Sequence, residues 1–238
     1  MIKHEDCVAW LRAMETGSAD ALITDPPYSS GGQFRGDRTS ATSTKYGSGE
    51  NLADFHGDNR DQRGFVAWSH LWLSEAYRVL RPGSFVGLFT DWRQLPTMTD
   101  AIQAGGFTWR GVFVWHKPNA RPSQARPTNA CEYVVWGSRG PMASKGDTHP
   151  GLVTAPPPYK RRHQTEKPQE VLRALVRVVP PRGLILDPFA GSGSLGMACA
   201  HEDRRYAGCE LSPHYADVSR RRIDGVTAQP DLWRGGDS

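Results

Sequence analysis

Residues 21–28 read ALITDPPY, a short apolar run followed at once by a carboxylate, two prolines and an aromatic ring. The apolar run predicts a buried strand over residues 21–24. Each proline lacks an N–H and biases the preceding residue toward extended geometry, so the chain after this strand is stiff. Asp25 and the carbonyl of Pro26 can accept hydrogen bonds, and Tyr28 can offer a flat face. The stretch therefore predicts a site for a planar ligand that carries an amino group.

A second apolar run, residues 183–186, leads into DPFAGSGS at 187–194. A glycine-rich turn between a strand and a helix lets the backbone pack closely against a ligand, and an acidic residue after the next strand can bind ribose hydroxyls. Glu210 follows the strand predicted over 205–209. Because the lysine and spacing of a phosphate loop are missing, this unit predicts a nucleoside site and disfavours a triphosphate.

Helix and strand patterns alternate along the rest of the chain. Apolar spacing predicts helices over residues 7–14, 65–80, 96–104, 169–179, 195–200 and 213–223, and strands over 2–5, 21–24, 84–90, 108–116, 132–136, 183–186 and 205–209. Such alternation is typical of a mostly parallel α/β sheet, in which we expect 108–116 and 132–136 to pair antiparallel at one edge. The tail from Asp224 has no periodic pattern and is expected to be unstructured.

Two irregular stretches interrupt the pattern in what we expect to be one domain over residues 1–238. Residues 29–64 are rich in Gly, Ser, Thr and charge, which predicts an inserted mobile loop that either closes over a ligand or is simply irregular. Residues 138–165 are rich in Pro and Gly and strongly basic, and are the candidate target-recognition segment. Neither stretch contains a helix-turn-helix or zinc-finger pattern that would name a recognition sequence.

The composition is that of a soluble globular protein, with 38% hydrophobic and 23% charged residues. No apolar run reaches transmembrane length, and the first residues lack the apolar core of a signal peptide, so we expect a cytoplasmic protein without a membrane partner. The cysteines show neither a C-x-x-C pair nor a repeated spacing, which predicts reduced thiols and no metal site. They are Cys7, Cys131, Cys199 and Cys209.

The net charge of +4 is unevenly distributed. Nine Lys or Arg residues lie between positions 117 and 167, against three acidic residues. Such a stretch can bind a polyanion, or it can be a solvated basic face without a partner. A nucleic acid becomes the better interpretation only when a site for one is argued independently.

The two motifs together resemble those of the S-adenosylmethionine-dependent DNA amino methyltransferases, which methylate the exocyclic nitrogen of adenine or cytosine. DPPY near the N-terminus, then a variable basic region, then FAGSG near the C-terminus is similar to the beta class of this family. In the beta class, the order of the elements along the chain is a circular permutation of the order in the common Rossmann-like methyltransferase sheet. The resemblance extends from Asp6 to about Ile223 and implies that fold, that cofactor and a double-stranded DNA partner.

The resemblance also implies roles for individual residues. Those assigned to catalysis are Asp25, Pro26, Pro27 and Tyr28. Those assigned to the cofactor site are Asp6, Cys7, Asp25, Thr165, Lys167, Asp187, Phe189, Ala190, Gly191, Ser192, Gly193, Glu210 and Leu211. Asp6 matches the acid near the cofactor's adenine, although Glu5 stands where the family usually has glycine, and a plain surface role for Asp6 stays open. Residues 165–168 resemble the family's T-x-K-P segment, where helix capping by Thr165 is the alternative.

The implied chemistry is methyl transfer to an aromatic amine, a poor nucleophile until its N–H groups are hydrogen-bonded. We expect Asp25 and the Pro26 carbonyl to accept those bonds, and Tyr28 to stack on a base flipped out of the duplex. Adenine-N6 is favoured because the adenine enzymes of this class typically have DPPY, whereas cytosine-N4 enzymes more often have SPPY. The alternatives are cytosine-N4 methylation, methylation of RNA or of protein glutamine, and a catalytically silent nucleic-acid-binding relative. A homodimer and a cognate restriction enzyme are both compatible with the sequence.

Overall fold

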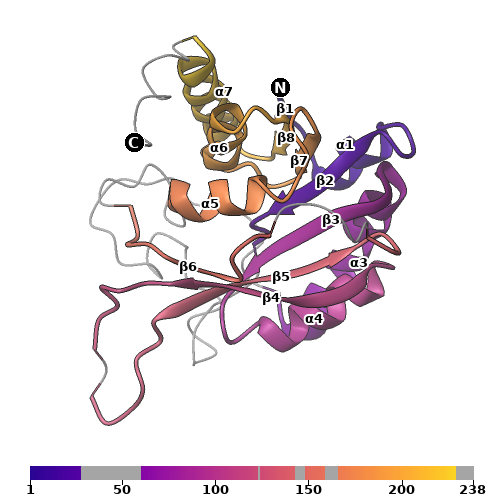
Figure 1. The fold of residues 1–238 in the computed structure, drawn as a ribbon. Coiled ribbons are helices and arrows are strands. Elements are labelled where there is room, and N and C mark those ends of the chain that lie inside the picture. Colours follow the sequence, from indigo (N-terminus) through magenta and orange to yellow (C-terminus); the bar gives the residue numbers. More distant parts are fainter. Residues whose placement is uncertain (28–59, 123, 143–147, 159–165, 229–238) are drawn as a thin grey trace.

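The computed structural model describes residues 1–27, 60–122, 124–142, 148–158 and 166–228, which form an eight-stranded sheet with helices on both faces (Figure 1). The strands are β1 (Ile2–His4), β2 (Ala19–Thr24), β3 (Leu80–Thr90), β4 (Thr108–His116), β5 (Cys131–Ser138), β6 (Leu152–Thr154), β7 (Leu184–Asp187) and β8 (Arg205–Glu210). The helices are α1 (Cys7–Arg12), α3 (Gln62–Val79), α4 (Leu95–Ala104), α5 (Gln169–Val176), α6 (Ser194–His201) and α7 (Pro213–Thr227).

The sheet has the order β1-β8-β7-β2-β3-β5-β4-β6, and β5 is the strand that runs against its neighbours. The predicted mostly parallel α/β fold is therefore confirmed. The first strand, β1, pairs with the last one, β8, as expected for a circularly permuted chain. The predicted antiparallel pair is present, but it does not form the edge, because the short strand β6 adds to β4 in parallel and lies outside it.

Two apolar clusters cover the two faces of the sheet, because successive side chains of a strand point to opposite faces. On β2, Leu22 packs into the cluster formed with α1, α3 and α4, whereas Ala21 and Ile23 pack into the cluster formed with α5 and α6. Val134 and Val135 of β5 divide in the same way. Figure 1 shows α5, α6 and α7 on one side of the sheet and α1, α3 and α4 on the other.

Helix α3 begins earlier than predicted and its end differs too. Asp61 caps it by accepting a hydrogen bond from the Gly64 N–H at 2.7 Å, so residues 62–64 are helical and not part of the predicted loop. Most of that loop, residues 29–59, lies outside the described residues. At the other end α3 passes directly into β3, and the predicted stop signal, residues 81–83, is a bulge within β3. The pairing of β2 with β3 steps there from Ala19↔Leu80 to Ala21↔Phe85.

Three further elements differ from the prediction. Strand β6 lies in the stretch expected to be irregular, where Ala155 donates its backbone N–H to the carbonyl of His116 at 3.1 Å. Helix α5 ends at Val176, three residues early, because the prolines at 180 and 181 disfavour helix before them. The expectation of an unstructured tail from Asp224 is wrong for residues 224–227, which continue α7 and bury Val226.

The described cysteines are free thiols, as predicted, and all but Cys131 are buried. Among the described helices none is long and apolar enough to cross a membrane. The residues that the structure describes also contain no group of three His, Cys, Asp or Glu side chains suited to a metal ion.

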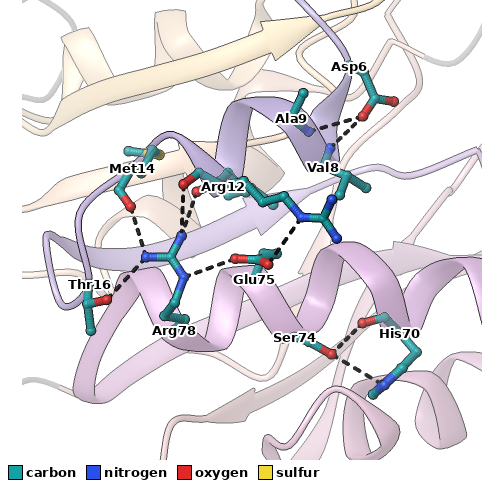
Figure 2. A network of polar contacts seen from close by, with 11 residues as sticks. Asp6, Val8, Ala9, Arg12, Met14, Thr16, His70, Ser74, Glu75 and Arg78 are labelled. Atoms are coloured by element: carbon teal, nitrogen blue, oxygen red, sulfur yellow. Dashed lines mark hydrogen bonds and ion pairs between the residues drawn. The ribbon is translucent and has the colours of Figure 1, made fainter.

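Arg78 of α3 ties that helix to the end of α1 (Figure 2). Its guanidinium donates to the carbonyl of Leu11 at 2.9 Å, to the carbonyl of Met14 at 2.9 Å and to Glu75 at 2.9 Å. The last carbonyls of a helix have no partner within the helix, so an arginine that reaches them satisfies groups that would otherwise depend on water. Arg12, by contrast, makes a long, exposed ion pair of 3.4 Å with the same Glu75.

We expect Arg78→Ala to lower the free energy of unfolding by about 2 kcal/mol, because several charge-assisted hydrogen bonds are lost at once. The matched control is Arg12→Ala, which removes one exposed ion pair and should cost about 0.5 kcal/mol or less. Urea denaturation of both variants measures the difference. Equal losses would show that the contacts of Arg78 contribute no more than a surface ion pair.

Candidate active site

The two sequence motifs meet where the order of the sheet reverses. From β2 the chain moves outward through α3 to β3, and from β7 it moves outward through α6 to β8, so β2 and β7 lie side by side at the switch point. In an open α/β sheet, ligands bind in the crevice outside the carboxyl ends of the strands at this point. Asp25 follows β2 and the glycine-rich turn follows β7, so both face that crevice.

A buried hydrogen bond joins the two motifs. Thr24 donates its hydroxyl to the Oδ1 of Asp187 at 2.6 Å, and that oxygen also accepts the Phe189 N–H at 3.2 Å. Tyr206 donates its hydroxyl to Oδ2 at 3.1 Å. Asp187 is only 3% exposed, and its burial raises its pKa to about 7, although the three hydrogen bonds act in the opposite direction. Asp187 thus lies in the predicted site with its carboxylate engaged by the protein.

The glycine-rich turn depends on two residues in the left-handed region. Gly191 has φ +51° and Gly193 has φ +82°, a region that side chains with a Cβ rarely adopt. A Cβ at Gly193 would come within 2.4 Å of the hydroxyl of Ser219 on α7, so this glycine also allows close packing of the turn on the helix. A Cβ at Gly191 would meet no atom within 4 Å, so the chain is open on that side.

Arg222 of α7 forms hydrogen bonds with this turn, and the sequence analysis did not predict this role. Its guanidinium donates to the carbonyl of Ser192 at 2.9 Å and to the hydroxyl of the same residue at 2.7 Å. It also forms a buried ion pair of 2.5 Å with Glu166. Through Arg222, the turn after β7 and the segment before α5 are fixed to each other. No local sequence signal marks Arg222, because its partners lie far away along the chain.

Aromatic and aliphatic side chains form the walls of the pocket. Phe189 packs against Trp68 and Trp72 of α3, with ring centroids 5.4 and 5.2 Å away. On the β3 side the wall is Phe89, and Leu172 of α5 and Leu195 of α6 close the pocket further. A pocket of this kind, apolar with a few convergent polar groups, suits a small organic ligand.

Seven of the sixteen predicted site residues line this pocket. They are Asp25, Lys167, Asp187, Phe189, Ala190, Gly191 and Ser192. Pro26 and Pro27 continue the chain after Asp25 without belonging to a helix or strand, as predicted. Tyr28 and Thr165 lie outside the described residues. Thr24, Phe89, Glu166, Ser194 and the aliphatic wall also line the pocket and were not predicted.

The remaining predicted residues lie at the ends of the next two strands. Glu210 ends β8 and accepts the N–H groups of Gly191 at 2.9 Å and Ser212 at 2.8 Å, and burial raises its pKa. Leu211 follows it and is exposed. Asp6 follows β1, whose residue His4 pairs with Glu210. The two acids thus end neighbouring strands, beside the pocket that Gly191 lines.

Asp6 and Cys7 also begin helix α1. One carboxylate oxygen of Asp6 accepts the N–H groups of Val8 at 2.9 Å and Ala9 at 3.1 Å, a helix cap that is visible in Figure 2. Cys7 is buried beneath it, and burial raises the pKa of its thiol to about 12. The cap orients Asp6 at the end of the sheet where Glu210 lies.

Asp25 is held by an ion pair that the sequence did not indicate. The ammonium of Lys167 lies 2.8 Å from its Oδ2 and 3.2 Å from Oε2 of Glu132 on β5. Glu132 receives a second ammonium, that of Lys117, at 2.9 Å. The arrangement combines a fixed carboxylate at a strand end with a glycine-rich turn on the neighbouring strand. It can hold an amino group of one ligand beside a second ligand of nucleoside type.

Comparison with known proteins gives a family match. The model of the DNA methylase family, N6_N4_Mtase, matches residues 19–150 and 144–221. Both motifs lie within the matched residues. The chain therefore belongs to the N6/N4 DNA methylase family.

Individual relatives and solved structures are also similar to this chain. YubD of Escherichia coli strain K12, which carries the name of a methylase, is 29% identical over 223 residues, or 93% of this chain and 88% of its own. The type II methyltransferase M.Cfr9I of Citrobacter freundii is 32% identical over 61% of this chain and 52% of its own length. The solved cytosine-N4-specific PvuII DNA methyltransferase has a TM-score of 0.70 at 16% identity, covering 99% of this chain and 93% of its own. The M1.HpyAVI–SAM complex has a TM-score of 0.67 at 19% identity, covering 94% and 98%.

The close approach at Gly193 predicts an asymmetry between two glycines. We expect Gly193→Ala to cost about 3 kcal/mol of unfolding free energy or more, because the new Cβ would combine left-handed strain with overlap on Ser219. Gly191→Ala adds a Cβ in open space and should cost only the left-handed strain of about 1–2 kcal/mol. Chemical denaturation of the two variants compares them. A larger loss for Gly191→Ala would contradict the packing described for the turn.

The raised pKa of Asp187 predicts a pH dependence of stability. Its pKa is about 7 in the folded protein against 3.8 for an exposed aspartate, so the folded state binds the proton more tightly. The contribution of Asp187 to the free energy of unfolding is fully present below pH ~4. It decreases by about 2–4 kcal/mol as the pH rises to ~7. Asp187→Asn should therefore gain stability relative to the natural protein over this window, measured by urea denaturation at each pH. Asp217→Asn, on the exposed face of α7, is the control. Its free energy of unfolding should change with pH in the same way as that of the natural protein.

Proposed function

We propose that this protein transfers a methyl group from S-adenosylmethionine to the exocyclic N6 amino group of adenine in double-stranded DNA. The observation that carries the proposal is the position of Asp25, which lines one pocket together with the glycine-rich turn over residues 189–192. Membership of the N6/N4 DNA methylase family supplies the class of reaction. The role of each side chain is inferred from the geometry.

The polar groups and apolar walls of the pocket are suited to S-adenosylmethionine. Gly191 leaves the turn open to a ligand, and Glu210 ends the neighbouring strand where a ribose hydroxyl would need an acceptor. Phe89 and Phe189 supply apolar walls. Two of the similar folds were solved with this molecule, M1.HpyAVI and a Thermus thermophilus protein with a TM-score of 0.68. When bound, S-adenosylmethionine supplies a methyl group on a positively charged sulfur, which is a strong electrophile.

The chain's own part is to position the amino group. The lone pair of an aromatic amine is delocalised into the ring, so hydrogen bonds from its N–H groups are needed to draw the nitrogen toward tetrahedral geometry. Asp25 would accept one of these bonds and the Pro26 carbonyl the other. The two prolines keep this short segment stiff, so the acceptors need little reorganisation as the reaction proceeds. Positioning supplies the rate, and no covalent enzyme intermediate is needed.

A base in a duplex must be flipped out to reach this pocket, which costs a few kcal/mol of unstacking. On sequence grounds we assign Tyr28 the role of stacking on the flipped base. The β4–β5 connection (described residues 117–122 and 124–130) begins at the edge of the sheet where Asp25 lies, because β2, β3 and β4 run in the same direction. Figure 1 shows this connection projecting beyond the sheet. Its exposed Arg121 and Arg126 are suited to phosphate contacts beside the flipped base.

Cytosine-N4 is the second candidate for the target. The PvuII enzyme of similar fold is cytosine-N4-specific, and both amines present two N–H groups to the same pair of acceptors. The DPPY motif of residues 25–28 favours adenine, because it resembles the motif typical of the adenine enzymes of the beta class. Digestion of methylated DNA to nucleosides, followed by mass spectrometry, separates N6-methyladenine from N4-methylcytosine. Detection of N4-methylcytosine alone would replace adenine by cytosine in the proposal.

Asp25→Ala should reduce methyl transfer by about 10²–10³-fold, because it removes an acceptor that acts on the reacting amine. Transfer of labelled methyl from S-adenosylmethionine to DNA measures the rate, and a gel-shift assay checks that DNA binding survives. Asp217→Asn, a surface carboxylate on α7 paired with Arg220, is the matched control and should retain full activity. DNA binding without methyl transfer by the natural protein would instead favour a silent nucleic-acid-binding relative.

A further inference from the structure

Lys167 lies in an unusual place for an ammonium group. Its side chain is only 6% exposed and lies between the carboxylates of Asp25 and Glu132, at 2.8 and 3.2 Å. The ring of Phe89 faces this ammonium, with its centroid 5.2 Å from Nζ. Because Lys117 binds the other oxygen of Glu132, two ammonium groups alternate with two carboxylates in one row. We call this row, Lys117–Glu132–Lys167–Asp25, the charge row.

The charge row is stable only as a balanced set. Burial alone would lower the pKa of Lys167, but Asp25 and Glu132 outweigh it and raise that pKa. Burial alone would likewise raise the pKa of Glu132, but the two lysines outweigh it and lower that pKa. Burying a charge without partners is costly, and removing one member of a buried pair costs more than replacing both. Lys167 therefore remains charged and fixed.

The members of the charge row come from separate parts of the fold. Asp25 follows β2, Glu132 lies on β5, Lys117 follows β4, and Lys167 precedes α5. Asp25 itself belongs to no helix or strand. Lys167 is anchored on its other side by Glu132 and Phe89. Its ammonium can therefore act as a rigid reference for the Asp25 carboxylate.

We infer that Lys167 is a positioning residue, which acts on the reaction by orienting the carboxylate of Asp25 toward the target amine. The inference rests on the proposed function and assigns a role that differs from contact with the cofactor. Glu132 is the second carboxylate that contacts the ammonium of Lys167, at 3.2 Å. A purely structural ion pair could be replaced by apolar side chains without loss of activity, whereas a positioning residue could not.

The test centres on a double variant that keeps the charges of the row balanced. Lys167→Met alone would leave two carboxylates without their shared ammonium, so the double variant Lys167→Met/Glu132→Gln is the one to measure. Glu132→Gln alone is the matched control, since it keeps the pair between Lys167 and Asp25. Thermal denaturation checks folding, calorimetric titration gives the Kd for S-adenosylmethionine, and single-turnover methyl transfer at saturating cofactor and DNA gives the rate.

We expect the double variant to bind S-adenosylmethionine within about threefold of the natural protein and to transfer methyl about 10²-fold more slowly, as a displacement of about 1 Å can cause. Glu132→Gln should stay within about tenfold of the natural rate, because Lys167 still pairs with Asp25. A double variant that reacts at the natural rate would overturn the inference. So would one whose cofactor Kd rises about 10²-fold while its saturated rate is unchanged, since Lys167 would then be a cofactor ligand.

Crystal structures of the natural protein and the double variant test the same inference without any activity. The Asp25 carboxylate should move or become multiply oriented when Lys167 is removed, and an unchanged carboxylate would overturn the positioning role. If the natural protein methylates no DNA, the proposed function fails, while this crystallographic comparison still decides the role of Lys167.

Discussion

The hydrogen bond between Thr24 and Asp187 joins residues 163 positions apart and lies between the carboxyl ends of the neighbouring strands β2 and β7. It forms because β2 and β7 are parallel neighbours, with Ala21 opposite Ile185 and Leu22 opposite Leu186. Parallel neighbours end at the same edge, so the segments that follow them must share one crevice. The pocket, the glycine-rich turn and the position of Asp25 all follow from this one pairing.

Much of the fold could be predicted from the sequence, because buried parallel strands are short continuous apolar runs between clear breaks. The prediction for β4, residues 108–116, agrees with the structure at both ends. Strand β6 was missed because three residues followed by prolines carry no periodicity, and it is a strand only through its pairing with β4. The bulge over residues 81–83 was predicted as a break for the same reason. Its local signals are those of a turn, and only the pairing of Leu80 with Ala19 shows that the strand has already begun.

The candidate site divides in a similar way. Residues within the two motifs, such as Asp25 and Gly191, were predicted because the chemistry requires particular residue types at fixed spacing. Glu132 and Arg222 were not, because a carboxylate on a strand and an arginine on a helix have no local signature of function. Their roles come from partners that are distant along the chain and near in the fold. Lys167 was assigned to the cofactor from its motif, and the structure adds the contact with Asp25 that the motif does not contain.

The basic residues form two populations that composition alone does not separate. Lys117 and Lys167 neutralise buried or half-buried carboxylates, and Arg139 donates to the carbonyl of Leu80 with its guanidinium over the ring of Tyr77. Exposed arginines such as Arg121 and Arg126 lie instead on the β4–β5 connection. Lys145 and residues 160–162 lie outside the described part of the chain. A charge already committed inside the fold cannot also neutralise a phosphate, so the basic stretch over residues 117–167 overstates the positive surface available to DNA. The projecting connection, and not the stretch as a whole, is therefore the part of the described chain where phosphate binding is best supported.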